Sequence, residues 1–441
     1  MSVTKRLTAF VFCFSAIACW AHAFAQGYPD ATMSMISYAP LAPQAATLKT
    51  AQWSAKLNAR LLSLPIGEHF FISMPGSDGK SASGNRIELV RRGLQPSGED
   101  IAILATPPDS MSGEQLLLTI SRNGAFSGRL DTPQESWSFT PYEDHAKVFS
   151  LANLQPMSLV DDAVPVVPPS EAFLRHEQTW APKAETQQQG PVTINLLVLF
   201  SSNLRALYPA KPGAMDVDGA VKTRLQYLVD YANTAHQNSG SMARLHIAGL
   251  HPILFFQNTK LEKGLNALRK HKGVFKPVGW WRERAHADLV VWVQDYREAK
   301  GSCGLGAMPL VPVGRAIGQY DLLGLIKQVD ASYSVVYDGH AGNYYCTDDT
   351  LAHETGHNMG LDHDRAHTSP VPAGYQLLTP FGYGYGIAGV FGDVMSYLDP
   401  KVPYFSTPLK ECAPGQPCGI ADQADCVRAI NLVAGAVAGL R

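Results

Sequence analysis

Short runs of alternating hydrophobic and polar positions occupy the first half of the chain, from about residue 46 to residue 151. Gly- and Pro-containing turns separate these runs, a pattern that is typical of β-strands. Residues 48–62 are compatible with either a helix or a connecting segment. The pattern therefore predicts a small β-rich N-terminal domain within residues 26–154, with strands at residues 69–73, 86–91, 101–105, 114–120 and 136–140.

The pattern breaks at residues 155–190, where prolines interrupt any regular element and a run of three glutamines precedes Gly190. Such a composition predicts an exposed linker that a protease can cut.

Longer apolar runs then alternate with segments of helical spacing through residues 191–441. Buried strands and helices in alternation predict a mixed α/β (α+β) domain, in which helices back a sheet. The predicted strands are residues 192–200, 245–256, 287–293 and 333–337, and the predicted helices are residues 218–238 and 261–271.

Composition places the chain among folded globular proteins. It has 441 residues, of which 46% are hydrophobic and 17% charged, enough for two domains with a large core. Its formal net charge of −2 gives no electrostatic reason to expect binding to nucleic acid or to a membrane surface. We expect a protein or peptide substrate, and a monomer in preference to an oligomer.

The first 25 residues have the features of a secretory signal peptide. Lys5 and Arg6 precede an apolar run that ends at the small-residue site Ala23-Phe24-Ala25. We therefore expect a secreted or periplasmic protein; lipidation at Cys19 is an alternative. No later apolar run reaches the ~20 residues of a membrane span.

Five cysteines follow the signal segment, and all of them lie in the C-terminal half of the chain. An oxidising compartment would pair most of them. The first expected pair is Cys303–Cys346, and one further pair with one remaining thiol is expected among Cys412, Cys418 and Cys426.

One stretch carries the chemistry: residues 353–364 have the pattern H-E-x-x-H-x-x-G-x-x-H-D. On a helix, His353 and His357 project from the same face and can bind one Zn²⁺, with Glu354 beside them. Gly360 can adopt a left-handed conformation that ends the helix and returns His363 to the metal. From average residue usage, the chance of this pattern in such a chain is on the order of one in 10⁵ or below.

The pattern predicts one catalytic zinc ion with three histidine ligands and a fourth position for water. Glu354 would act as general base on that water, which then hydrolyses a peptide bond. A helix N-cap at Asp348 or Asp349 is expected for the zinc helix. Calcium stays possible, but no calcium-binding repeat indicates it.

The long zinc motif followed by Gly392-Asp-Val-Met395-Ser-Tyr397 resembles the metzincin clan of zinc endopeptidases. Asp364 after the third histidine resembles the reprolysin (adamalysin) type. Together with Ser302-Cys-Gly-Leu-Gly306 and Val402-Pro-Tyr-Phe-Ser-Thr-Pro408, residues 192–441 are similar to bacterial peptidyl-Asp metalloendopeptidases. The resemblance implies a metzincin-like catalytic domain with a twisted mixed sheet and the zinc helix across the cleft floor.

The resemblance also implies supporting roles. Met395 would form an apolar floor beneath the ligands, and Asp364 would hold the chain that carries His363. Tyr397 is either a metal or oxyanion contact or a packed turn residue. Residues 304–308 would form the cleft-edge strand that pairs with an extended substrate. Cleavage before Asp is also implied, and Arg365, Lys401 and Lys410 are candidate cations for that pocket.

The function predicted from these features is a secreted zinc endopeptidase made as a zymogen. The N-terminal region would be a propeptide or inhibitory domain. Because residues 26–189 contain no cysteine, latency would need a carboxylate, a histidine or steric cover. Two alternatives are an exported effector protease with a narrow specificity and a non-catalytic binding module in which zinc only stabilises the fold.

Overall fold

The structure is a computed structural model of the chain. It describes residues 34–41, 52–75, 86–97, 100–109, 114–157, 162–167, 190–254, 260–297, 301–314 and 330–441. The predicted signal segment with Cys19 lies outside the described residues, as do residues 168–189 of the predicted linker.

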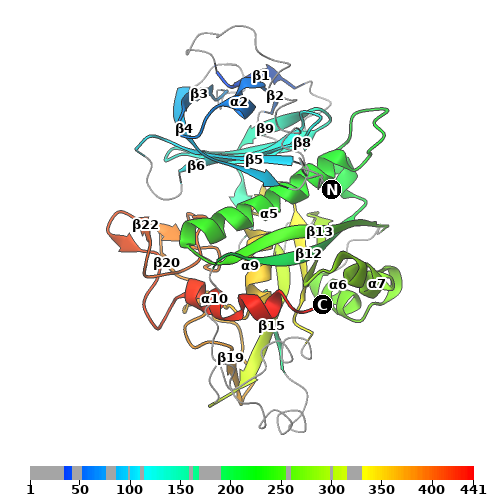
Figure 1. The fold of residues 1–441 in the computed structure, drawn as a ribbon, viewed down its shortest axis with the longest axis vertical. Helices are drawn as coiled ribbons and strands as arrows, with labels where there is room; N and C mark the ends of the chain where they lie inside the picture. Colours follow the sequence, from blue (N-terminus) through cyan, green and yellow to red (C-terminus); the bar gives the residue numbers. More distant parts are fainter. Residues whose placement is uncertain are drawn as a thin grey trace, which may run out of the picture.

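Nine antiparallel strands form the N-terminal sheet, in the order β1-β2-β9-β8-β7-β6-β5-β4-β3 (Figure 1). Most neighbours in the sheet are also neighbours in sequence. The two ends of the sheet approach each other, and the Met35 N–H beside β1 donates to the Phe71 carbonyl in β3 at 2.8 Å. The strands are β1 (Ile36–Pro40), β2 (Trp53–Leu57), β3 (His69–Ser73), β4 (Arg86–Ser97), β5 (Asp100–Thr106), β6 (Gln115–Ile120), β7 (Phe126–Asp131), β8 (Ser136–Tyr142) and β9 (His145–Ser150).

The five predicted N-terminal strands correspond to β3, β4, β5, β6 and β8. The structure differs at residues 48–62, where β2 and the short helix α2 (Arg60–Ser63) replace a single helix or connection. Strands β1, β7 and β9 lack a clear apolar period and were not predicted. They form because their neighbours supply hydrogen-bond partners and a hydrophobic face.

The central sheet of the C-terminal region is mixed, in the order β11-β15-β16-β14-β12-β13. Strands β16, β14, β12 and β13 are parallel, whereas β15 is antiparallel to β16. The predicted mixed α/β arrangement is confirmed. The strands are β11 (Ala163–Val166), β12 (Val192–Ser201), β13 (Ala243–Ile253), β14 (Leu289–Asp295), β15 (Gly304–Pro312) and β16 (Tyr333–Asp338).

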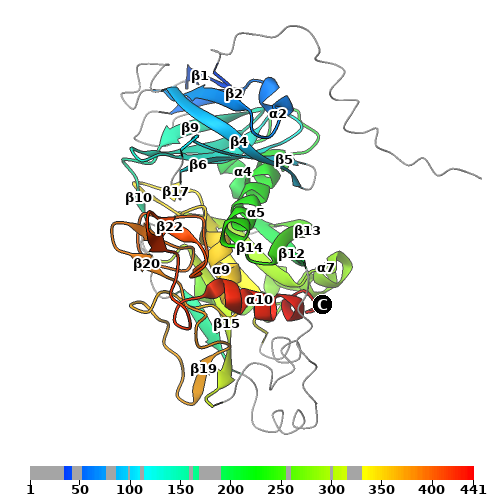
Figure 2. The ribbon, with the colours of Figure 1, turned by 60° about the vertical axis from the view of Figure 1, so that its left-hand side comes forward.

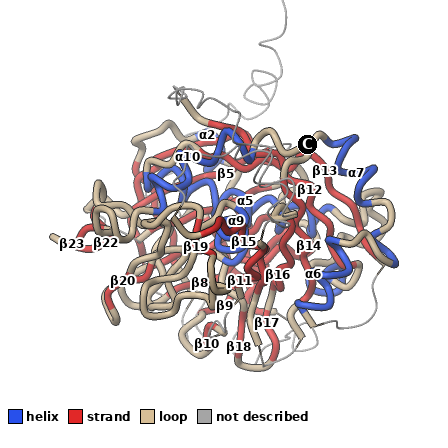
Figure 3. The backbone as a smooth tube through the Cα atoms, turned by 90° about the horizontal axis from the view of Figure 1, so that it is seen from below, coloured by secondary structure: helices blue, strands red, loops and turns tan. Residues whose placement is uncertain are grey.

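Helices cover both faces of this sheet, which explains why β14 is buried along its whole length. Val291 packs into the core beneath α5, α9 and α10, whereas Trp292 packs into the core beneath α6 and α7. Figure 3 shows α9 beside β15 and α6 on the other side of the strands. The helices are α4 (Leu204–Leu207), α5 (Gly219–Ser239), α6 (Leu261–Arg269), α7 (Val278–Ala285), α9 (Thr350–Asn358) and α10 (Cys426–Val437), with a 3₁₀ turn, η3, at Gly273–Phe275. Of the α-helices, α4, α7 and α10 were not predicted.

The N-terminal sheet stacks on α5, as Figures 1 and 2 show from two directions. Strand β6 is buried at every position because its two faces serve two cores. Leu118 belongs to the N-terminal core, whereas Leu117 packs into the core of the C-terminal region. The Thr119 hydroxyl donates to Asp230 on α5 at 2.6 Å.

The segment predicted to be a linker differs from that expectation where the structure describes it. Residues Gln155–Pro156 form β10, which pairs in parallel with β18 (Tyr344–Tyr345). Residues Ala163–Val166 form β11, which pairs in parallel with β15. Backbone pairing with the C-terminal region outweighs the local proline content, and Pro165 fits because β11 is an edge strand.

Small strand pairs and loops complete the C-terminal region. β17 (His340–Ala341) pairs with β18, and β19 (Tyr375–Leu377) pairs with β15. The hairpins β20–β21 and β22–β23 follow, at Gly386–Ile387, Phe391–Gly392, Glu411–Ala413 and Gln416–Pro417.

Two disulfides cross-link this region. Cys303–Cys346 has an S–S distance of 2.10 Å and is the pair expected first. Cys412 pairs with Cys418, which leaves Cys426 as a buried free thiol. No helix among the described residues is both long and apolar enough to cross a membrane.

Candidate metal centre

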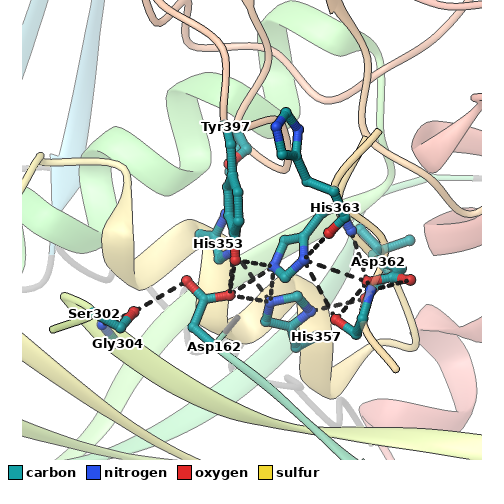
Figure 4. Close-up of polar contacts among 12 residues, drawn as sticks. Asp162, Ser302, Gly304, His353, His357, Asp362, His363 and Tyr397 are labelled. Carbon is teal, nitrogen blue, oxygen red and sulfur yellow. Dashed lines mark hydrogen bonds and ion pairs between the residues drawn. The ribbon is translucent and has the colours of Figure 1, made fainter. Parts of the chain in front are cut away.

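Helix α9 places the first two predicted ligands on one buried face. His353 and His357 are four positions apart, and their Nε2 atoms lie 3.1 Å from each other (Figure 4). The Nε2 atom of His363 lies 3.1 Å from that of His357. The three imidazoles therefore converge on one point.

Gly360 makes the turn that returns His363 to this point. Helix α9 ends at Asn358, and Gly360 has φ +83°, a left-handed conformation. A Cβ atom at Gly360 would also lie 2.6 Å from Cδ1 of Leu378. Conformation and close packing both select glycine here.

Hydrogen bonds at the opposite ring nitrogens orient the three imidazoles. Each Nδ1–H donates to a backbone carbonyl, which leaves the Nε2 lone pair directed into the cluster. The acceptors are the carbonyls of Val394, Leu361 and His367, at 2.7, 2.9 and 3.1 Å from His353, His357 and His363.

A fourth side chain, Asp162, enters the cluster from the segment that precedes β11. Its Oδ1 atom lies 3.3 Å from Nε2 of His353, 3.3 Å from that of His357 and 2.6 Å from that of His363. These four ligand atoms all lie within 4.8 Å of one another, and all four residues are buried. Burial disfavours the charged carboxylate, but the imidazoles, His353 foremost, hold the pKa of Asp162 well below its usual range.

Sequence reasoning missed Asp162. The available signal was weak: an acidic residue directly before the short apolar run Ala163-Val164, inside a Pro-rich segment. Nothing local relates it to His353, which lies 191 positions further along the chain.

The donor set fits a divalent zinc ion. Three imidazole lone pairs and one carboxylate oxygen facing one another repel unless a cation lies between them. Three histidines with one carboxylate are ligands that Zn²⁺ accepts in a four-coordinate site. Among the described residues, this is the one group of His, Cys, Asp and Glu side chains with metal-ligand spacing.

Glu354 lies beside the cluster without a partner. Its side chain is fully buried, and neither carboxylate oxygen has a hydrogen-bond partner. Burial, and then the nearby charge of Asp162, raises the pKa of Glu354 well above its usual range.

Two glycines of β15 make room for this carboxyl group. A Cβ atom on Gly304 would overlap the Glu354 carboxylate, and one on Gly306 would lie 2.9 Å from Oε2. The close approach of Glu354 therefore explains why glycine occupies positions 304 and 306 of the predicted cleft-edge strand.

Met395 lies beneath α9. Its side chain is fully buried and packs against Gly356, where any Cβ would collide with the Met395 sulfur. Met395 therefore belongs to the apolar packing around α9, and its role as a floor beneath the ligands stays a prediction.

Asp364 connects the turn that carries His363 to the segment after Met395. Its Oδ1 accepts from His367 Nδ1 at 2.7 Å, and its Oδ2 accepts from the Tyr397 N–H at 2.9 Å. The Tyr397 hydroxyl reaches the cluster, at 2.8 Å from Asp162 Oδ1 and 2.9 Å from His363 Nε2. The Tyr397 hydroxyl therefore lies next to the cluster of candidate ligand atoms.

Two aspartates precede α9, and neither caps it with its side chain. Asp349 is the N-cap residue but makes no side-chain cap hydrogen bond. Asp348 instead accepts from the buried Arg224 guanidinium at 2.7 Å, and Arg224 also binds Asp338 at 2.7 Å. This ion triad ties α5 to the start of the zinc helix.

The three candidate cations for an acidic-substrate pocket have other contacts. Arg365 donates to the carbonyls of Pro380 and Gln423. Lys401 lies 3.6 Å from Asp349, and Lys410 is an exposed residue beside Gly240.

Comparison with known proteins identifies relatives of this region. Residues 222–364 match the family described as metallo-peptidase family M12B, reprolysin-like. A peptidyl-Asp metalloendopeptidase from Pseudomonas aeruginosa is 29% identical over 275 residues, which cover 58% of this chain and 42% of that protein. The match thus spans less than half of the relative's length. The predicted resemblance to reprolysin-like metallopeptidases is confirmed.

Two solved structures are also similar. One, described as a chaperone–substrate complex, has a TM-score of 0.42 at 17% identity and covers 74% of this chain and 41% of that chain. The other, metalloproteinase-II from Bacteroides fragilis, has a TM-score of 0.34 at 11% identity and covers 69% of this chain and 84% of that chain. Both TM-scores are below 0.5, so neither establishes a shared fold.

Proposed function

We propose that this protein is a zinc endopeptidase. His353, His357 and His363 hold the ion, and Glu354 is the general base. The observation that carries the proposal is the convergence of three Nε2 lone pairs beside a buried carboxyl group with no hydrogen-bond partner. A zinc ion held there would act as a Lewis acid that polarises the scissile carbonyl and acidifies water.

The protein's own groups move the protons. Glu354 accepts a proton from the attacking water, whose oxygen adds to the carbonyl carbon. It then donates a proton to the leaving amine as the C–N bond breaks. The close fit of Gly304 and Gly306 around Glu354 limits its movement and keeps it near the metal ligands.

Substrate would bind along β15. On the side of β15 away from β16, the strands that pair with it are β11 and the short β19. Without β11, most of this side of β15 would be an open sheet edge. A peptide that replaces β11 would gain backbone hydrogen bonds from β15. The Tyr397 hydroxyl would donate to the carbonyl oxygen on which negative charge develops.

The test replaces Glu354 with Gln in the full chain and measures bound zinc and cleavage of casein. We expect one zinc per chain to be retained and cleavage to fall by about 10³-fold or more, because the proton acceptor is lost. Glu262→Gln, at an exposed position on α6, is the matched control and should cleave like the parent. Substantial cleavage by Glu354→Gln would contradict the proposed mechanism.

A second function is favoured by one observation. Structural zinc sites are usually closed by a fourth protein ligand, and Asp162 supplies such a ligand here. A binding module stabilised by zinc therefore competes with the enzyme. Against it, such a module has no use for Glu354, whose burial without a partner costs free energy.

The relative's name suggests a substrate preference. If the preference is shared, this protein cleaves before Asp. A peptide-library digest measures it: enrichment of Asp directly after the cut supports the preference, and a flat profile opposes it. The same digest distinguishes a general protease from a narrow-specificity effector.

We further propose export and synthesis as a zymogen, with residues 26–154 as the propeptide. The disulfides Cys303–Cys346 and Cys412–Cys418 support an oxidising compartment. Mass spectrometry of the exported protein would locate the mature N-terminus; a mature chain that still begins before residue 154 would oppose removal of a propeptide.

A further inference from the structure

Asp162 presents its side chain, and not its backbone carbonyl, to the cluster. The carboxylate Oδ1 faces all three imidazoles and accepts a hydrogen bond from the Tyr397 hydroxyl. The Asp162 carbonyl instead accepts from the Gly306 N–H at 3.0 Å. The peptide bond between Asp162 and Ala163 is therefore held away from the cluster of imidazoles, where the carbonyl of a bond to be cleaved would have to lie.

The next four residues cover the edge of β15. Strand β11 pairs in parallel with β15, from Ala163 opposite Gly306 to Val166 opposite Pro309. Met308 and Ala163 are both buried in one small apolar cluster. No extended peptide can pair with this part of β15 while β11 is in place.

The chain before Asp162 is anchored at two places. Strand β10 pairs with β18, which lies a few residues before α9. Further back, the N-terminal sheet is held on α5 by the Thr119–Asp230 hydrogen bond and by Ser127, which accepts from Arg224 at 3.3 Å. The segment thus reaches the metal centre from a folded domain docked on the opposite side of α5 (Figure 1).

From this arrangement we infer that Asp162 is the fourth zinc ligand of a latent form, and that β11 blocks the substrate strand site in the same form. This inference rests on the proposed function, whose latency it explains without a cysteine. Four protein ligands leave no open position for water. Because Asp162 directly precedes β11, release of its carboxylate from the metal also loosens β11, and activation requires both to leave.

The test uses the full chain with Co²⁺ in place of Zn²⁺, because Co²⁺ absorbs visible light in a way that reports its ligands. We expect azide, a small anion that binds open metal positions, to leave the visible spectrum of the parent unchanged. In Asp162→Asn and Asp162→Ala the starting spectrum should differ and azide should change it further. Asp109→Asn, at an exposed position of the N-terminal region, is the matched control.

Cleavage of a quenched fluorescent peptide by the zinc-loaded proteins is the second readout. If the blocked form makes up at least nine-tenths of the parent, both Asp162 variants should cleave at least about tenfold faster. Asp109→Asn should match the parent.

The outcomes separate the two proposals. Azide binding to the parent, or identical spectra of the parent and the Asp162 variants, would overturn the ligand assignment. Equal cleavage by the parent and the variants would overturn latency but leave the peptidase proposal intact. Changed spectra with no cleavage by any protein would support the ligand assignment and count against the peptidase. If the variants fail to fold, the azide test on the parent still decides whether the fourth position is closed.

Discussion

The N-terminal and C-terminal regions of this protein differ in the kinds of side chains that they bury. The N-terminal sheet packs a cluster of apolar side chains and buries few ionisable ones, Arg91 and Lys147 among them. The C-terminal region buries more ionisable groups: the metal cluster, Glu354, and the triad of Arg224, Asp338 and Asp348. Buried charges cost free energy unless they are paired or bind a metal. The region that carries this cost is the one in which the chemistry lies.

The largest stability effect is expected at the triad. Arg224→Leu leaves the carboxylates of Asp338 and Asp348 buried without their cation, which should cost about 3–5 kcal/mol of unfolding free energy. Urea unfolding followed by circular dichroism measures it. Lys222→Leu, at an exposed position on the same helix, should change stability by no more than about 0.5 kcal/mol. Equal effects of the two changes would show that the buried triad does not contribute more to stability than an exposed position on the same helix.

A pH dependence of nearly that size is expected from Asp393. Burial raises its pKa from 3.8 to about 7 in the folded protein. Between pH 4 and 7 the unfolded chain loses this proton while the folded protein keeps it, so stability falls as pH rises through this window. At about 1.4 kcal/mol per pH unit the contribution is up to roughly 4 kcal/mol and is fully lost above pH 7.

Asp393→Asn should remove this component, because an amide does not titrate and can still accept from the Ser396 N–H. We therefore expect the variant to gain stability over the parent at pH 8 and not at pH 4. Urea unfolding at the two pH values measures it, with Asp109→Asn as control. A parent-to-variant difference that is the same at both pH values would contradict the assignment.

A smaller effect is expected where β15 contacts Glu354. In Gly304→Ala the added methyl group would overlap the Glu354 carboxylate, at a cost of about 1–3 kcal/mol. Because Glu354 must move, cleavage should fall even where the protein stays folded. Gly93→Ala in the N-terminal sheet is the control, since its Cβ would lie 4.0 Å from the nearest neighbouring atom, on Leu104. Unimpaired cleavage by Gly304→Ala would argue against the position assigned to Glu354.

The smallest effect is expected in the apolar core of the N-terminal sheet. Ile103→Val removes one buried methylene and should cost about 0.5–1.5 kcal/mol. The zinc content should not change, because none of the four cluster residues belongs to this core. Loss of zinc in this variant would show that the two regions are not separable.

Local patterns singled out most of the residues that the structure brings together in the candidate metal centre. His353, Glu354 and His357 share one helix, and Gly360 acts through its own backbone conformation. The arrangement of these residues therefore depends only on helix geometry and on one turn within a dozen residues. The alternating runs of β3 and β5 and the buried run of β12 were predicted for the same reason. Strands β10 and β11 were missed because their partners, β18 and β15, are far away in sequence.

Local sequence patterns could not predict the position of Asp162 beside the histidines. Its role depends on a backbone path that brings residue 162 to residues 353–363, and no periodicity encodes that path. The absence of a cysteine from residues 26–189 indicated that latency would need another group to block the metal, but not which one.

The most direct test is a crystal structure of the zinc-loaded full chain with anomalous diffraction at the zinc edge. We expect one anomalous peak, about 2.0–2.2 Å from Nε2 of His353, His357 and His363 and from Oδ1 of Asp162. A peak bound by the three histidines and a water, with Asp162 turned away, would contradict the latent form. The absence of a peak among the histidines would contradict the metal centre itself.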